Sequence, residues 1–300
     1  MMRLALIVAV AALASPAVAK DKGPDRMETF HDLAPVTLAP DRAYLLVRLM
    51  MPTDGVSYAP IFIRQPGPEE LAAYQRAKEK TFAVERPKLL EKRAKVLAER
   101  DAALAKGIPF DKPVPPEPNI ALFSIEYRDA QNVYLLRYGN SYDKSAHERV
   151  LLVSVPPGTY VLAGQGSLIT PVSCLCMGTV KLTARGGVIT DLGYVLADRA
   201  DRMKHVSDLP EIAAITKDHD KYNTDVLFHA MAVRPYAAGM PIPVPLQALP
   251  REAASYEAFG KMPNYFSPIV MRLAPLPGVL GYEEDRVIDL RTGKDADSAP

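Results

Sequence analysis

Short apolar stretches, each bounded by Pro, Gly or Asp, recur along most of the chain, and their lengths suit β-strands. The first two, at residues 42–50 and 58–64, are rich in β-branched and aromatic residues, and we expect them to form the first hairpin of a sheet. Further strands are predicted at 120–127, 133–138, 149–155, 159–163, 179–184 and 188–196. This pattern predicts a mainly β fold, an antiparallel β-sandwich, because alternating β-α-β units would need helical patterns between the strands.

A different pattern occupies residues 69–106, which are dominated by Ala, Glu, Lys, Arg and Leu and contain no Gly. This composition predicts helix, and Pro87 inside it predicts two helices that meet at that residue. Leu90, Leu97 and Leu104 recur every seven residues and form an apolar seam along the second helix. We interpret this seam as a candidate partner-binding surface, while the charged residues between its members predict a solvated face.

Proline marks the segments in which neither helix nor central strand is expected. Residues 107–119 are proline-rich and should return the chain to the sheet, so that the helical pair is an insertion. In the last third, residues 241–245 predict polyproline II, 206–215 and 251–261 predict short helices, and 286–290 predict a last strand. We expect this region to form an irregular, proline-rich C-terminal arm packed on the sandwich.

The N-terminus has the features of a secretory signal peptide. Arg3 precedes an apolar run at 4–13, and Ala17 and Ala19 form a small-x-small cleavage site before Lys20. We predict cleavage between Ala19 and Lys20 and a periplasmic or secreted mature protein; an uncleaved N-terminal anchor is the alternative. No later stretch reaches about 18 uninterrupted apolar residues, so we expect no transmembrane segment.

These predictions divide the chain into five parts: a signal peptide at 1–19, the first strands at 20–68, the helical insertion with its return at 69–118, the rest of the sandwich at 119–200, and the C-terminal arm at 201–300.

Part of the predicted sheet resembles a known kind of domain. Residues 151–196 contain an apolar strand, the turn Pro156-Pro157-Gly158, a second apolar strand and two further strands. This arrangement resembles the small β-sandwich domains of bacterial envelope proteins, of the PEGA and carboxypeptidase-regulatory-like kind. The resemblance implies a sandwich fold and a non-catalytic role, without shared active-site residues.

Composition and charge narrow the classes of partner. The chain is 48% hydrophobic and 24% charged, which is enough apolar material for a sizeable core. Its net charge is +1 at pH 7, and the predicted leader carries only Arg3, so the mature chain is neutral. A neutral balance gives no electrostatic reason to expect nucleic acid. We expect the partner to be another envelope protein or a second copy of the chain.

The densest candidate chemistry is the segment Cys174-Leu-Cys176-Met177. On an extended strand, residues two apart have Cα atoms roughly 6.5–7 Å apart, at the limit for a disulfide, so a ring would need a turn. Pro171 and Gly178 make a turn possible. The alternatives are an intramolecular disulfide or inert pair, free thiols or a disulfide to another chain, a thiol-redox couple, and a Cu(I) site with Met177 as the thioether ligand.

Catalytic signatures are sparse. Neither GxSxG, GxxxxGK[ST] nor GxGxxG is present in the sequence. His219 lies between Asp218 and Asp220, which suits either a solvated turn or, in an unfamiliar hydrolase, a base. We therefore expect a non-catalytic periplasmic binding or structural interaction module of the bacterial envelope, without a cofactor. The alternative is a thiol-redox or Cu(I)-binding protein that uses Cys174, Cys176 and Met177.

Overall fold

The computed structural model of the chain describes residues 27–50, 59–120, 123, 125–127, 132–137, 141–144, 148–166, 172–198, 230–266, 268–283 and 286–296. The predicted leader at 1–19, the predicted helix at 206–215 and the sequence around His219 lie outside these ranges.

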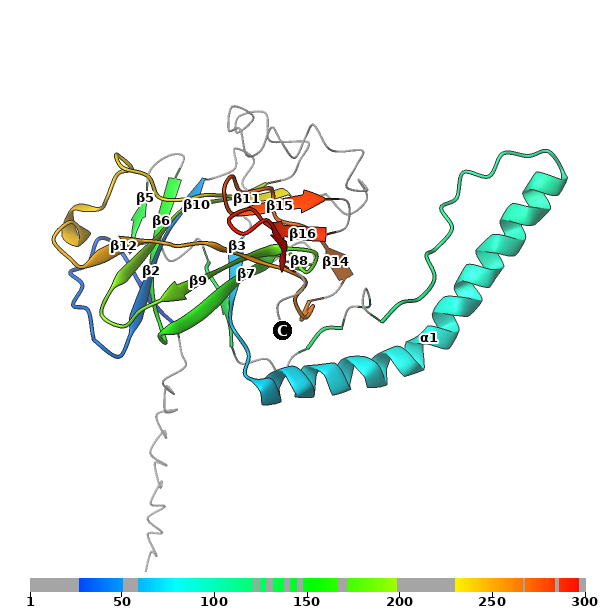
Figure 1. Ribbon diagram of the computed structural model, residues 1–300, viewed down its shortest axis with the longest axis horizontal. Helices are drawn as coiled ribbons and strands as arrows, with labels where there is room; N and C mark the ends of the chain where they lie inside the picture. The colour runs from blue at the N-terminus through cyan, green and yellow to red at the C-terminus, as the bar shows by residue number, and fades with distance from the viewer. Residues whose placement is uncertain are drawn as a thin grey trace, which may run out of the picture.

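The described strands form three sheets, and most of their pairings are antiparallel (Figure 1). The first sheet has the order β1 (Glu28–Phe30), β6 (Glu148–Val155), β2 (Ala43–Met50), β10 (Ile189–Asp198) and β11 (Ala230–Arg234), with β5 (Asp143–Lys144) beside β6 and β12 (Arg251–Ala253) beside β10. Its central pair, β2 and β10, is parallel. The prediction of a mainly β fold with mostly antiparallel pairing is therefore confirmed.

The second sheet has the order β13 (Glu257–Phe259), β9 (Thr179–Ala184), β7 (Gly158–Gly166), β3 (Ala59–Arg64) and β4 (Val133–Leu135), and it is extended by β8 (Val172–Cys174) on β7 and by β14 (Pro268–Val270) on β8. A third, small sheet contains β15 (Leu280–Glu283), β16 (Arg286–Asp289) and β17 (Lys294–Asp295).

The predicted hairpin of residues 42–50 and 58–64 is wrong. β2 pairs with β6 and β10 in the first sheet, whereas β3 pairs with β4 and β7 in the second. The chain changes sheets in the same way between β6 and β7 and between β9 and β10. A turn signal fixes where a strand ends, but the partner of that strand depends on which faces become buried together.

Side chains from the two large sheets meet in one apolar cluster. Leu45 and Val47 of β2 and Val153 of β6 contribute from the first sheet, and Phe62 of β3 and Leu162 of β7 from the second. The opposite side of the first sheet also carries buried residues, because its strands are covered by chain segments from elsewhere. Burial on both faces explains why β2 is apolar apart from Arg48 and does not alternate.

One α-helix is assigned in the described part of the chain, α1 (Pro68–Ala105), which is 38 residues long. It begins with Pro68 at its first position, and the N–H of Gly67 donates a hydrogen bond to the Glu70 carboxylate at 2.8 Å. The predicted helical pair is wrong, because α1 continues through Pro87. A proline inside a helix removes one backbone hydrogen bond and bends the helix without necessarily ending it. The ribbon of α1 is bent (Figure 1).

The C-terminal third is more regular than predicted, since it supplies β11 to β17. Residues 251–261 contain β12 and β13 and not a helix, because β12 pairs with β10 of the first sheet and β13 with β9 of the second. Within 241–245 the expected polyproline II gives way to a short 3-10 helix, η4 (Val244–Leu246). The predicted strand at 286–290 is confirmed as β16, whereas 120–127 has no strand at its described residues.

Candidate functional site

A disulfide joins Cys174, the last residue of β8, to Cys176 in the following turn. The Cα atoms of the two cysteines are 5.2 Å apart, shorter than in an extended strand, because the chain turns immediately after β8. The turn is fixed on both sides: the N–H of Leu175 donates to the carbonyl of Ala163 at 2.7 Å, and the N–H of Met271 donates to the carbonyl of Cys174 at 2.7 Å. Of the alternatives left open by the sequence, the structure has the intramolecular disulfide.

The disulfide is buried against the second sheet. Both cysteines belong to an apolar cluster on the outer face of that sheet, together with Ile61 and Val161. Gly164 of β7 lies opposite Cys174, and a Cβ on this glycine would lie only 1.9 Å from the carbonyl oxygen of Ser173. Glycine therefore allows β8 to approach β7 closely enough to hold the disulfide in place.

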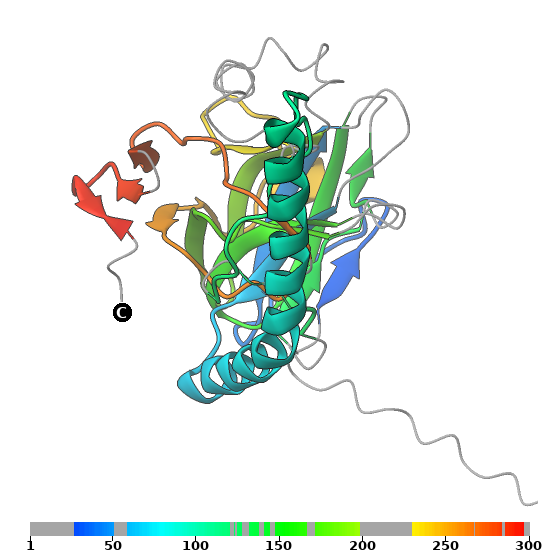
Figure 2. The same cartoon turned by 90° about the vertical axis from the view of Figure 1, so that its right-hand side faces the viewer.

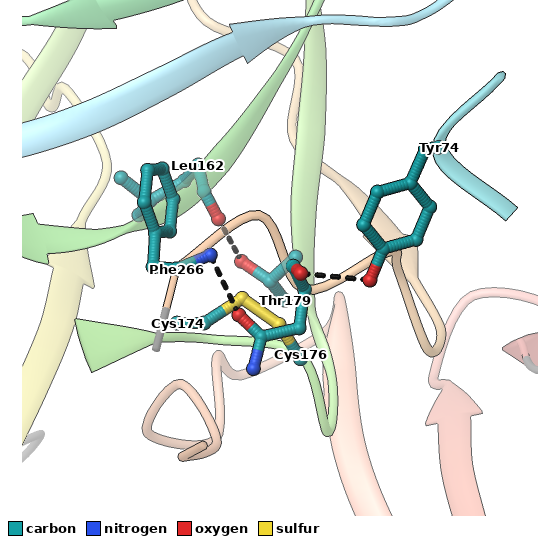
Figure 3. The surroundings of a disulfide bond; sticks show 7 residues. Tyr74, Leu162, Cys174, Cys176, Thr179 and Phe266 are labelled. Atoms are coloured by element: carbon teal, nitrogen blue, oxygen red, sulfur yellow. Dashed lines mark hydrogen bonds between the residues drawn. A yellow bond between two sulfur atoms is a disulfide. The ribbon is translucent and has the colours of Figure 1, made fainter. Parts of the chain in front are cut away.

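The base of α1 is attached to the same cluster through Tyr74 (Figure 3). Its ring makes edge contacts with Tyr127 and Tyr265, at centroid distances of 5.5 and 4.9 Å. Its hydroxyl donates a hydrogen bond to the backbone carbonyl of Asn264 at 2.7 Å, and the side-chain oxygen of Asn264 accepts one from the N–H of Phe266 at 2.9 Å. The disulfide, the segment 262–266 and the first turns of α1 thus form one packed unit.

Burial affects the ionisation of this unit. It is the main reason that the pKa of the Tyr74 hydroxyl is raised well above its ordinary value. Burial, with smaller contributions from Glu70 and Tyr127, raises the pKa of Tyr265 to about 12. Both tyrosines are therefore neutral hydrogen-bonding groups at physiological pH and not bases.

The predicted Cu(I) ligands lie close together, but the two sulfur atoms of Cys174 and Cys176 are bonded to each other. A thiolate site for copper would require reduction of that bond. Met177 follows in the turn and is half-buried. In the described disulfide form this segment fixes structure and offers no thiolate.

The residues of the predicted seam have unequal environments. Leu90 and Leu97 are half-buried, whereas Leu104, in the last turn of α1, is 59% exposed. Val96, the neighbour of Leu97, is buried. The seam is therefore not a uniform exposed stripe, and the most accessible of its members lies at the far end of the helix.

Beyond its base, α1 and the return segment project away from the sheets (Figure 1), so that in Figure 2 α1 lies in front of them. We call residues 84–119 the arm; this segment is distinct from the predicted C-terminal arm at 201–300. Val84 is 60% exposed and Ile108 is 53% exposed, and the two legs of the arm are connected by an ion pair between Glu99 and Lys112 at 2.9 Å. The arm exposes large apolar side chains, whereas those of the sheets are mostly buried.

A Schellman motif closes the end of the arm. The N–H of Gly107 donates to the carbonyl of Leu104, and the N–H of Ile108 donates to the carbonyl of Ala103, both at 3.0 Å. Gly107 has a φ of +68°, which glycine adopts without strain. Carbonyl groups that a helix end would leave for water are therefore paired within the chain.

A buried ion pair in the first sheet was not predicted. Arg48 of β2 and Asp191 of β10 are fully buried, and their side chains make two hydrogen bonds, Nη1 to Oδ1 at 2.5 Å and Nη2 to Oδ2 at 3.2 Å. Arg48 also donates to the carbonyl of Pro241 at 2.8 Å, and Asp191 accepts from the N–H of Gly193 at 3.0 Å. Both charged groups are hydrogen-bonded to several partners within the chain. We therefore interpret the pair as a structural link between two strands and not as a ligand-binding site. The signal in the sequence was a charged residue inside each of two apolar strands.

The remaining candidate from the sequence is the segment around His219. His219 and its flanking aspartates lie outside the described residues. In the part of the chain that the structure describes, no helix is long and apolar enough to cross a membrane.

The comparisons with known proteins give no assignment: no family model, no curated protein and no solved structure matches the chain.

Proposed function

We propose that the protein is an exported, non-catalytic interaction module of the bacterial envelope. In this proposal the two large sheets are the layers of a β-sandwich that serves as a rigid base, and the arm reaches a second envelope component. The shared apolar cluster between the sheets supports the sandwich. The predicted signal peptide supports export.

The observation that carries the proposal is the exposure of the arm. Val84, Leu104 and Ile108 are each more than half exposed and lie on an element that projects from the sheets (Figure 1). Exposed apolar side chains on a projecting element contribute little free energy to folding, and burying them against another surface is favourable. The predicted seam contributes through Leu104, whereas Leu90 and Leu97 are half-buried.

Site-specific photo-crosslinking in cells tests this proposal. A photoreactive amino acid is placed at Leu104, at Ile108 and, as a control outside the arm, at Leu290, which lies in the turn after β16 and is 47% exposed. The two arm positions should crosslink to an envelope component, with a yield several times that of Leu290. Equal yields at all three positions, or none from the arm, would contradict the proposal.

The second candidate is thiol-disulfide exchange, and the observation that favours it is the disulfide between Cys174 and Cys176. Exchange would require attack by an external thiolate on a sulfur atom, and both cysteines are buried. Mass spectrometry of alkylated protein, after incubation with a dithiol reductant under native conditions, separates the two functions. Rapid labelling of both cysteines would favour thiol-disulfide exchange. Labelling only after denaturation would contradict exchange and favour the interaction module.

A further inference from the structure

The end of the arm has an unusual sequence. Residues 102–110 read Ala-Ala-Leu-Ala-Lys-Gly-Ile-Pro-Phe and contain one charged side chain, Lys106. We call these residues the tip. Leu104 and Ile108 are both more than half exposed, and Pro109 between Ile108 and Phe110 is exposed as well. The tip lies at the end of the arm, far from the sheets (Figure 1). Its exposed apolar side chains contribute little to folding, and such side chains are typical of an interaction surface.

Charged residues flank the tip on both legs and cancel one another. Arg100 pairs with Asp101, and Lys112 pairs with Glu99, while Asp111 offsets Lys106. Paired charges therefore bound the tip on both legs of the arm. Lys106 has a long apolar stem that can extend its ammonium group outward while the rest of the tip is covered.

Part of the backbone at the tip is hydrogen-bonded within the chain. Carbonyl groups of Ala103 and Leu104, which would otherwise face solvent at the helix end, accept hydrogen bonds from Lys106, Gly107 and Ile108. Unpaired backbone groups are costly in the apolar part of a bilayer. A helix end with a Schellman motif carries fewer of them than an open one.

We infer that the tip inserts into the interfacial region of a lipid bilayer. The inference deepens the proposed function, on which it rests, by naming a lipid surface as the component that the arm reaches. Few large apolar side chains are exposed at the tip, whereas a stable protein interface buries about 800 Å² on each partner. A lipid surface requires only that a few apolar side chains be buried and that the flanking charges stay at the headgroups.

The equal numbers of acidic and basic side chains around the tip predict how binding depends on the charge of the lipid. A basic segment would bind through anionic lipids and would be released by salt. Residues 99–112 carry equal numbers of acidic and basic side chains, so their binding should depend on apolar contact. Binding to vesicles of phosphatidylcholine and to vesicles of phosphatidylethanolamine and phosphatidylglycerol should agree within about threefold, and should change by less than about twofold between 0.1 and 0.5 M salt.

Vesicle flotation tests the inference directly. The chain from Lys20 is used, because the apolar leader at 4–13 would itself bind lipid. The wild type should float with both kinds of vesicle, whereas Leu104→Asp and Ile108→Asp should each reduce the bound fraction about tenfold or more. Val84→Asp is the matched control, since Val84 is equally exposed on the same helix but outside the tip, and it should float like the wild type.

Three outcomes would overturn the inference: a wild type that does not float, binding that Val84→Asp abolishes as fully as Ile108→Asp does, or binding that requires anionic lipid and survives both tip variants. Failure here is distinct from failure of the proposed function. If the wild type does not float but Leu104 still crosslinks to an envelope protein in cells, the arm binds a protein and the lipid inference alone is wrong.

Discussion

The sheets and the arm belong to one chain but are stabilised in opposite ways. In the sheets, almost every large side chain is buried, and even charged groups such as Arg48 and Asp191 are paired inside. In the arm, α1 buries Val96 but exposes Val84 and Leu104, and its ion pairs lie at the surface. The sheets therefore hold their shape through tertiary contacts, whereas the arm depends on local helix formation and a few contacts between its legs.

The largest expected effect comes from breaking the buried pair in the sheets. Asp191→Ala leaves the Arg48 guanidinium buried without its carboxylate, and we expect the free energy of unfolding to fall by about 3–5 kcal/mol. Urea unfolding followed by circular dichroism measures it. Combining Asp191→Leu with Arg48→Leu removes both charges and should restore much of the loss; a cost below about 1 kcal/mol for Asp191→Ala would mean that the pair is not buried.

Alkaline pH should weaken the packing at the base of α1, where Tyr265 contacts Tyr74. The raised pKa of Tyr265, about 12 against an ordinary 10.0, means that the folded state favours the neutral phenol. The stability that this provides is present below pH 10 and is lost as the pH rises towards 12, on the order of 2 kcal/mol for this residue. Residues 84–119 contain no tyrosine, so the arm carries no such group.

Unfolding at pH 9, 10 and 11, with absorbance at 295 nm to follow phenolate formation, checks this dependence. Burial lowers the pKa of Lys78, which contributes in the opposite direction, but that gain is complete near its ordinary value of 10.5. Tyr265→Phe cannot ionise and should show a shallower loss of stability above pH 10. An identical slope in the wild type and the variant would contradict the assignment.

Removing the disulfide should have a smaller effect. Cys174→Ala with Cys176→Ala opens a ring of only three residues, and the chain-entropy estimate for so short a loop is about 1.5 kcal/mol. Thermal unfolding of the double variant and of the reduced wild type should give similar losses. Hydrogen exchange should then rise in the first turns of α1, which share the disulfide's cluster through Tyr74; unchanged exchange there would separate the disulfide from the helix base.

The smallest effect is expected in the arm. Leu104→Asp and Val84→Asp replace side chains that are 59% and 60% exposed, so each should change the free energy of unfolding by less than about 0.5 kcal/mol. The same urea titration that detects Asp191→Ala serves as the measurement. A loss above 1 kcal/mol from either variant would show that the arm is folded against the sheets and is not an independent projection.

Local patterns predicted the strands well and their partners badly. Residues 179–184 form β9 with the predicted bounds, because alternation and flanking turns are properties of the segment itself. The hairpin of β2 with β3 failed because β2 is buried on both faces, so its pattern does not indicate which sheet it joins. Residues 251–261 failed for a related reason: their helical composition is overridden by pairing with strands far away in the sequence.

Some features of the candidate site were predictable from the sequence, and others required the structure. The spacing of Cys174 and Cys176 was visible in the sequence, but the turn that closes their ring is also held by Met271, which is distant in the sequence. The attachment of Tyr74 was not predictable, since its hydroxyl binds the backbone of Asn264, 190 residues along the chain. Exposure of the tip also required the structure, because a helical pattern does not show which of its apolar residues lack a neighbour.

The parallel pairing of β2 with β10 has a consequence for how the protein folds. The two strands that form the centre of the first sheet are separated in sequence by the helix, the return segment and most of the second sheet. Arg48 therefore pairs with a carboxylate 143 residues further along the chain. Closing so long a loop carries an entropic cost that few early contacts offset, and chains dominated by such pairings fold slowly. The first sheet should be the last part to consolidate, and an unpaired β2 edge should be the surface at which incompletely folded chains associate with one another.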